Sequence, residues 1–265
     1  MTGVPLQQIV EYLDEYLHIG EVPDESNAVN GLQVANTGRI GGIVAAVDAS
    51  QATIDGVIAS LEDDVTAPPL LLVHHGLMWE GNAPLTGRRY RRFSALLNHE
   101  IAVYAAHMPL DVHPEVGNNA VLAERLGIRV EGWFGNYRGI PIGVWGQAPS
   151  ILSTREAVAQ ELDRVLHTLK GSATLIPGGP ERPSRIGIIT GGAGNMIAQA
   201  RDAGLDTFIT GEGPHHTYFD AMEWGLNLVY AGHYATETLG VQALASHLAE
   251  RFELDWEFHD HPTGL

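Results

Sequence analysis

The segment Leu228–Glu237 (LVYAGHYATE) combines two kinds of sequence pattern. It begins with an apolar run typical of a buried strand, and apolar side chains then recur at helical spacing as far as Phe252. The segment therefore predicts a strand that is followed at once by a helix. A helix would place His233 and Glu237 on one face, where an imidazole and a carboxylate are a common pair of metal ligands. Taken alone, the pair is better explained as a helix-opening glutamate, favoured by the helix dipole, beside an incidental histidine.

Strand and helix patterns alternate through the rest of the chain. This alternation predicts an α/β fold with mixed or parallel sheets. The predicted helices span residues 6–19, 50–61, 88–99, 117–126, 153–169, 195–203 and 217–224. The predicted strands span residues 30–34, 43–47, 70–73, 101–106, 185–190, 207–210 and 226–231. Residues 128–150 contain short β-like pieces, and Ile176–Gly179 is expected to form a turn. In the helix at 88–99, the apolar side is expected to consist of Tyr90, Phe93, Leu96 and Leu97, and the arginines between Arg88 and Arg92 are expected to form a solvated or interface face.

The two halves of the chain repeat one order of elements. Each contains a strand, a helix, a strand that ends in a His-His pair, a second helix, and a strand that ends in a histidine followed four residues later by a carboxylate. We therefore expect two similar lobes, residues 1–127 and 128–265, with mixed or parallel sheets flanked by helices and a metal cleft between them. The C-terminal segment 226–265 is an alternative candidate for packing back on the first lobe.

The composition excludes several functional classes. The chain has 265 residues and no cysteine, so disulfides and thiolate sites are excluded, and any transition metal would need His, Asp, Glu or water ligands. The formal charge of −17 opposes binding to nucleic acids. Lys170 is the only lysine, and the acidity resembles that of proteins adapted to high salt. No membrane-spanning stretch or signal peptide is evident, so we expect a cytoplasmic protein.

Histidines follow the predicted strands at their carboxyl ends, where α/β sheets usually bind ligands. The motifs are His74-His75, His107 with Asp111, His215-His216 with Glu212, and His233 with Glu237. Each has a plain structural alternative. The first pair would be one surface and one core histidine, Asp111 would cap a turn around Pro109, and the residues near His215 would be polar caps of a helix. Four such motifs in one cysteine-free chain favour metal ligation.

The sequence argues against several other catalytic arrangements. It contains no Gly-x-Ser-x-Gly elbow, and the glycine-rich segment Gly191–Gly194 lacks the Lys-Ser/Thr of a phosphate-binding P-loop. A tight turn, or at most a substrate contact, is the simpler interpretation of that segment. The chemistry that remains is the activation of water by metal ions, with two ions bridged by a carboxylate as the expected arrangement.

At these residues the chain resembles the NIF-three-like family, which includes YbgI-like bacterial proteins and GTP cyclohydrolase I type 2 homologues. The matching motifs are NGLQV (30–34), HHGLMW (74–79), AHMPLD (106–111), TGE with the following HH (210–216) and GHYATE (232–237). They occur in the family's order over nearly the whole chain. The departures are Gly76, where proline is usual, and Met108-Pro109, where Thr-Asn is usual.

The resemblance implies a two-lobed α/β fold, a dinuclear metal site in a cleft and toroidal homohexamers. The implied ligands are His74, His75, Asp111, His233 and Glu237, with Asp111 or Glu237 bridging two divalent ions. His107, His215 and Glu212 are then the candidate catalytic or supporting residues. Because the donors are nitrogen and oxygen, Zn²⁺, Mn²⁺, Fe²⁺, Co²⁺ and Ni²⁺ are all candidates.

The family name suggests a hydrolase that uses a metal-activated water on a small molecule, GTP, opening the purine ring at C8 with release of formate. The alternative is a metal carrier or regulatory binding protein that uses the same ligands without turnover.

Overall fold

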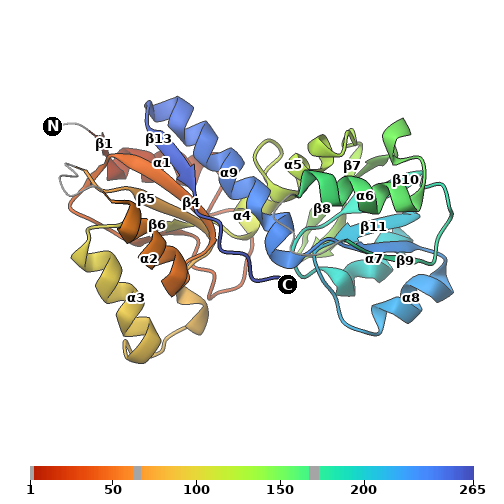
Figure 1. The fold of residues 1–265 in the computed structure, drawn as a ribbon, viewed down its shortest axis with the longest axis horizontal. Coiled ribbons are helices and arrows are strands. Elements are labelled where there is room, and N and C mark those ends of the chain that lie inside the picture. Colours follow the sequence, from red (N-terminus) through yellow and green to blue (C-terminus); the bar gives the residue numbers. More distant parts are fainter. Residues whose placement is uncertain (1–2, 62–66, 167–172) are drawn as a thin grey trace. The chain divides into compact units, whose positions relative to one another are not determined.

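The structure, a computed structural model, describes residues 3–61, 67–166 and 173–265. It divides the chain into two compact units (Figure 1). Unit 1 contains the residues up to Leu110 together with Val241–His261, and unit 2 contains Asp111–Gly240 and Pro262–Leu265. The chain passes from one unit to the other within a short helix, α4 (Met108–Asp111), and within a long one, α9 (His233–Phe252).

Unit 1 is built on a mixed sheet with the strand order β13-β4-β5-β6-β2. Its elements are β1 (Val4–Pro5), α1 (Leu6–Tyr16), β2 (Gly31–Val34), β3 (Arg39–Ile40), β4 (Gly42–Asp48), α2 (Gln51–Ser60), β5 (Leu70–His75), η1 (Met78–Glu80), α3 (Gly87–Asn98), β6 (Ala102–Ala105) and β13 (Asp255–Phe258). Strands β13, β4, β5 and β6 are parallel, and β2 runs antiparallel to β6. Strands β1 and β3 form a separate antiparallel pair.

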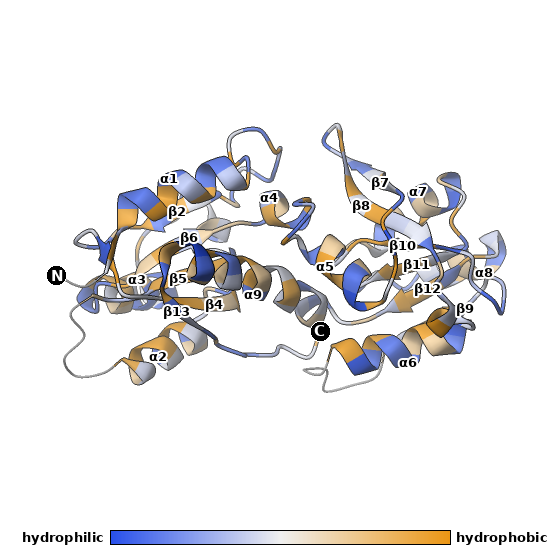
Figure 2. Cartoon of the chain, turned by 90° about the horizontal axis from the view of Figure 1, so that it is seen from above, coloured by the Kyte–Doolittle hydropathy of each residue, from blue (hydrophilic) through white to orange (hydrophobic). Residues whose placement is uncertain are grey.

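The central strand of unit 1 is apolar on both faces. The side chains of Leu70, Leu71, Leu72 and Val73 are all fully buried, as expected for a parallel strand with helices on both sides. Ile54 and Val57 of α2 and Leu96 of α3 belong to the core cluster on one face. Helix α1 covers the opposite face (Figure 2). This packing fixes the carboxyl end of β5, where the first two histidines lie.

Unit 2 contains a second mixed sheet, with the order β7-β8-β10-β11-β12-β9. Its elements are α5 (Asn118–Arg125), β7 (Gly132–Tyr137), β8 (Ile140–Gln147), η2 (Ser150–Leu152), α6 (Arg155–Val165), β9 (Thr174–Pro177), β10 (Arg185–Ile188), η3 (Gly194–Met196), α7 (Ile197–Asp202), β11 (Thr207–Thr210), α8 (Thr217–Trp224) and β12 (Asn227–Tyr230). Strands β10, β11 and β12 are parallel, whereas β8 and β9 are antiparallel to their neighbours β10 and β12.

The two sheets repeat one topology. In unit 1 the parallel strands β4, β5 and β6 alternate with α2 and α3 along the chain, and β2 is added antiparallel beside β6. In unit 2 the parallel strands β10, β11 and β12 alternate with α7 and α8, and β9 is added antiparallel beside β12. The internal repeat expected from the histidine motifs is therefore present in the backbone.

The division into units differs from the predicted boundary at residue 127. Helix α5 packs on β8 and β10, so it belongs to unit 2 although it had been assigned to the first lobe. Of the C-terminal segment 226–265, β12 lies in the sheet of unit 2, whereas β13 pairs with β4 in unit 1.

Two strands of the five- and six-stranded sheets were not predicted, and neither was the separate pair of β1 and β3. Ile176–Gly179, predicted as a turn, overlaps β9, a short strand at the sheet edge that ends at Pro177. Strand β13 has the sequence DWEF, is largely exposed and also lies at a sheet edge. Such short edge strands show no strong apolar alternation. The helix predicted to reach residue 169 is α6, which ends at Val165, and residues 167–169 lie outside the described part of the chain.

The predicted faces of α3 were partly wrong. Tyr90 and Leu97 are 58% and 57% exposed, whereas Arg89 is only 7% exposed. Burial of Arg89 is tolerated because its guanidinium donates hydrogen bonds to the carbonyls of Gly81 and Ala83 and lies 5.7 Å from the centre of the Phe93 ring.

Candidate functional site

Three histidines of unit 1 form a compact cluster. His74 and His75 are the last residues of β5, and His107 follows β6, the neighbouring parallel strand. The ring centroid of His74 lies 4.7 Å from that of His75 and 4.9 Å from that of His107. One nitrogen from each of the three rings can be chosen so that all lie within 4.8 Å of one another. This spacing is compatible with a bound metal ion.

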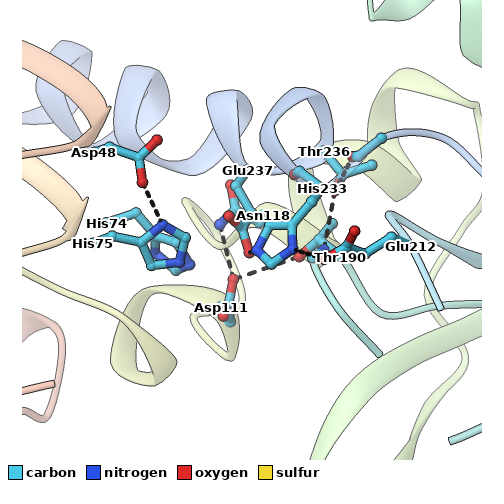
Figure 3. A network of polar contacts seen from close by, with 12 residues as sticks. Asp48, His74, His75, Asp111, Asn118, Thr190, Glu212, His233, Thr236 and Glu237 are labelled. Atoms are coloured by element: carbon cyan, nitrogen blue, oxygen red, sulfur yellow. Dashed lines mark hydrogen bonds and ion pairs between the residues drawn. The ribbon is translucent and has the colours of Figure 1, made fainter. Parts of the chain in front are cut away.

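Each ring of this cluster is anchored through Nδ1. His74 Nδ1 donates to the carbonyl of Ala106 at 2.9 Å, and His75 Nδ1 pairs with Oδ1 of Asp48 at 2.9 Å (Figure 3). His107 Nδ1 pairs with Oδ1 of Asp24, also at 2.9 Å. Because a carbonyl or carboxylate oxygen only accepts, a neutral imidazole in each of these positions carries its proton on Nδ1, and Nε2 is then the nitrogen that could ligate a metal. Hydrogen bonds of this kind usually orient metal-ligating histidines.

Asp24 lies in a loop, but its carboxylate is buried and accepts several hydrogen bonds. Its side chain is 6% exposed and also accepts hydrogen bonds from the side chain of Asn30 and the backbone amides of Glu25 and Met108. Burial alone would raise the pKa of Asp24, but the hydrogen bonds from His107, Asn30 and Met108 outweigh it and lower the pKa below its usual value. Asp24 therefore stays ionised opposite His107.

Asp24 and Asp48 were not assigned roles from the sequence. Asp48 ends the strand β4, and this position at a carboxyl end was a signal that could have suggested it. Asp24 lies in a loop far from the histidine motifs in sequence, and it meets His107 only through the fold.

In unit 2, the opening motif of α9 brings a histidine and two glutamates together. His233 Nδ1 lies 2.8 Å from Oε1 of Glu212, and its Nε2 lies 3.2 Å from Oε1 of Glu237 (Figure 3). Glu237 is 3% exposed. The hydrogen bond to Glu237, opposed by burial and assisted by the charges of Glu237 and Glu212, raises the pKa of His233 to about 9. Without a metal, a proton therefore occupies the position between His233 and Glu237 at neutral pH.

The glycine-rich segment after β10 packs directly against this pair. Gly191 has φ 69°, and a Cβ placed on it would lie 2.2 Å from Oε1 of Glu237. Its amide donates to Oγ1 of Thr236 at 3.0 Å, and its carbonyl accepts from the amides of Gly211 and Glu212. The segment is thus a tight turn, as the simpler interpretation predicted, and it positions Glu237 and Glu212.

Asp111, the last residue of α4, lies in a separate hydrogen-bonded group of unit 2. Its Oδ1 accepts from Nδ2 of Asn118 at 2.8 Å and from Oγ1 of Thr190 at 3.5 Å (Figure 3). Asn119 donates to the backbone carbonyl of Asp111 and accepts from the amide of Thr190. Asp111 therefore sits at the end of a short helix, and its carboxylate is oriented by α5 and by the end of β10.

The remaining predicted residues have different surroundings. His215 and His216 are exposed at the start of α8, and the ring of His215 lies edge-on to Phe219 at 5.6 Å. Within the described residues, neither histidine belongs to a group able to hold a metal. Glu212 orients His233, and His107 belongs to the His74–His75 cluster.

The donor set fits a divalent metal ion. The three histidines of unit 1 offer oriented Nε2 lone pairs, and unit 2 offers a buried carboxylate and an imidazole. Nitrogen and oxygen donors without sulfur suit Zn²⁺, Mn²⁺, Fe²⁺, Co²⁺ and Ni²⁺.

Comparison with known proteins identifies the family. The family model for Duf34/NIF3 (NGG1p interacting factor 3) matches residues 4–263. The chain belongs to the Duf34/NIF3 family. A Deinococcus radiodurans member named GTP cyclohydrolase 1 type 2 homolog is 42% identical over 260 residues, covering 97% of this chain and 94% of the relative.

Solved structures of family members agree with the fold. The structure of protein ybgI, described as of unknown function, has a TM-score of 0.87 and 34% identity, covering 99% of this chain and 100% of the other. That of TTHA1606 from Thermus thermophilus has a TM-score of 0.84 and 36% identity, with the same coverage. The resemblance drawn from the motifs and the expected α/β fold with two mixed sheets are confirmed. In the described part of this Duf34/NIF3 chain, no helix has the length and apolar character needed to span a membrane.

Proposed function

We propose that this protein binds two divalent metal ions and acts as a metal-dependent hydrolase of the GTP cyclohydrolase type 2 homologue kind. The observation that supports it best is the cluster of His74, His75 and His107, whose Nδ1 atoms are all hydrogen-bonded to oxygen acceptors. Histidines that serve only packing have no need for three such hydrogen bonds, nor for one nitrogen from each ring to lie within 4.8 Å of the others.

The proposed ligands are the two residue sets described above. His74 and His75 of unit 1 and Asp111, His233 and Glu237 of unit 2 would hold the ions. Divalent ions bound by these groups would supply Lewis-acid chemistry, acidifying a water molecule and polarising the substrate.

The protein's own residues would orient the ligands and manage protons. Asp48 and the Ala106 carbonyl fix the rings of His75 and His74, and Glu212 fixes His233. His107 shares the geometry of the other two histidines, so its Nε2 would serve either as a further ligand or as a proton acceptor beside the ions. His215, exposed at the start of α8, would reach only a substrate that extends to that surface.

Metal content tests this proposal first. We expect two ions per chain in protein purified without chelators, or restored after chelation by Zn²⁺, Mn²⁺ or Fe²⁺. Glu237→Ala and His74→Ala should each lower the stoichiometry. His99→Ala provides the matched control, because His99 is exposed at the end of α3 and makes its ring hydrogen bond to a backbone carbonyl. Full metal content in Glu237→Ala would refute the ligand assignment.

Turnover separates the hydrolase from its alternative. Metal-loaded protein given GTP should release formate, and Glu237→Ala should not. If two ions bind but no metal supports formate release above background, a metal carrier or regulatory metal-binding protein is the better description. This second candidate is favoured by the same ligands and needs no reacting substrate.

A further inference from the structure

One aromatic side chain lies against the histidine cluster. Trp79, in η1, has its ring centroid 5.0 Å from that of His107 and 6.0 Å from that of His75, with interplanar angles of 85° and 76°. Trp79 is 36% exposed, although tryptophan side chains are highly buried on average. The indole therefore forms part of the surface immediately beside the proposed ligands.

The segment that presents Trp79 is held rigidly. In the loop that follows η1, the carbonyls of Gly81 and Ala83 both accept hydrogen bonds from the guanidinium of Arg89, the first at 3.0 Å. The amide of Leu77, at the start of η1, donates to Oε1 of Gln33 at 2.6 Å. The indole is thus fixed before any ligand arrives, which reduces the entropy lost on binding.

Three of the four arginines of the following helix, α3, are already engaged, and the fourth, Arg91, is exposed. Arg88 and Arg92 both pair with Glu80, at 3.1 Å and 2.5 Å, and Arg89 is buried on backbone carbonyls. The surface around Trp79 therefore offers an aromatic ring but little positive charge for a phosphate. The net charge of −17 adds to this preference.

We propose that Trp79 is a positioning residue that stacks against a planar nitrogen heterocycle of the substrate and so sets the ring beside the ions. This inference rests on the proposed function and names its substrate class: recognition is directed at the heterocyclic base and not at the phosphates. Stacking of a base on an aromatic side chain is worth about 1–3 kcal/mol by alanine substitution, which corresponds to roughly a 5- to 150-fold change in affinity.

Binding to Zn²⁺-loaded protein by calorimetry, with guanosine and inorganic tripolyphosphate as separate probes, provides the test. Trp79→Ala should weaken guanosine binding about 10-fold or more, and Trp79→Phe should retain most of it. Tripolyphosphate binding and metal content should not change in either variant. Trp256→Ala is the matched control, since Trp256 is 37% exposed in β13 of the same unit.

Each other outcome overturns the inference. If guanosine does not bind the wild-type protein, or binds Trp79→Ala equally well, the indole does not recognise a base. If Trp79→Ala loses metal, the indole only supports His75 and His107. If it loses tripolyphosphate affinity as much as guanosine affinity, the residue acts on the whole site. Guanosine titration of metal-free wild-type protein and of Trp79→Phe, each followed by tryptophan fluorescence, isolates the contribution of Trp79 from that of the other four tryptophans even if the proposed metal chemistry fails.

Discussion

The Nδ1 atom of His107 lies 2.9 Å from Oδ1 and 3.1 Å from Oδ2 of Asp24, a residue 83 positions earlier in the chain. Asp24 uses both oxygens to accept further hydrogen bonds from Glu25, Asn30 and Met108. This contact makes the orientation of His107 depend on the loop that contains Asp24. An ordinary surface histidine has no such buried carboxylate to orient its ring.

Replacing Asp24 by asparagine tests the contact. One amide oxygen cannot accept from all four donors, so the NH₂ group of the new side chain would face a donor within the buried loop. We expect the affinity for Zn²⁺ to fall by about 10- to 100-fold, the usual effect of removing such a partner. A competition titration with a coloured chelator measures it.

The matched control is Asp55→Asn, because Asp55 is an exposed residue of α2 that accepts one hydrogen bond from Gln51. This variant should bind Zn²⁺ as the wild type does. Unchanged affinity in Asp24→Asn would show that metal binding does not depend on the contact between Asp24 and His107, and would favour His107 as a proton acceptor over a ligand.

The stability of the metal-free protein should depend on pH through His233. Its pKa in the folded state is about 9, above the ordinary value of 6.5. The ion pair with Glu237 therefore stabilises the fold fully below about pH 6.5 and is lost as the pH rises through about 9. Denaturant unfolding of chelator-treated protein across this range should show declining stability. In Glu237→Gln this part of the decline should be absent; an equal decline in both proteins would assign it to other groups.

Metal binding should release protons. A metal at His233 must displace the proton that its raised pKa retains at neutral pH. Calorimetry at about pH 7.5, in buffers that differ in ionisation enthalpy, should show proton release, and the apparent affinity should increase with pH toward about 9. Glu237→Gln and His233→Ala should both reduce the number of protons released. Binding without proton release would place the ion elsewhere.

Gly191 should be far less tolerant of alanine than other glycines with a similar backbone. Both Gly191 (φ 69°) and Gly225 (φ 71°) have positive φ, so alanine costs roughly 1–2 kcal/mol at each from the backbone alone. A Cβ at Gly225 meets nothing within 4 Å, whereas one at Gly191 would lie 2.2 Å from Oε1 of Glu237. Gly191→Ala should therefore lose additional stability and metal affinity. Equal metal affinity in the two variants would exclude this packing role.

The charge of −17 predicts a salt effect on stability. Raising NaCl from about 0.1 M to about 1 M shortens the Debye length from about 10 Å to about 3 Å, which screens repulsion among exposed carboxylates. The thermal midpoint should rise. A midpoint that is constant or falls with salt would argue against adaptation of this surface to high salt.

The features that could be predicted from the sequence were those that recur along the chain, namely apolar strand patterns and histidines at strand ends. Apolar runs such as Leu70–Val73 gave the buried strands, and the histidines at strand ends pointed to one edge of each sheet. The helix predicted at 117–126 is followed by Gly127 with φ 69°, which fits the preference for glycine where a helix stops on a left-handed residue.

What escaped prediction depends on contacts between residues distant in sequence. Asp24 shows no local pattern that marks it as the partner of His107. Arg89 was predicted to lie on a solvated or interface face. It is buried instead, because its guanidinium donates hydrogen bonds to the carbonyls of Gly81 and Ala83. The edge strand β13 is largely exposed, so its pairing with β4 leaves little trace in hydrophobicity.

The pairing of β13 with β4 has a consequence for the order of folding during synthesis. Strands β1 to β6 of unit 1 are synthesised first, but β13, which pairs with the edge of β4 opposite β5, follows all the strands of unit 2. The sheet of unit 2 is complete once β12 has been made, so unit 2 can close while unit 1 still exposes an unpaired strand edge. A chain that has not yet produced β13 therefore exposes one edge of β4, and truncation before Asp255 should leave unit 1 prone to aggregation.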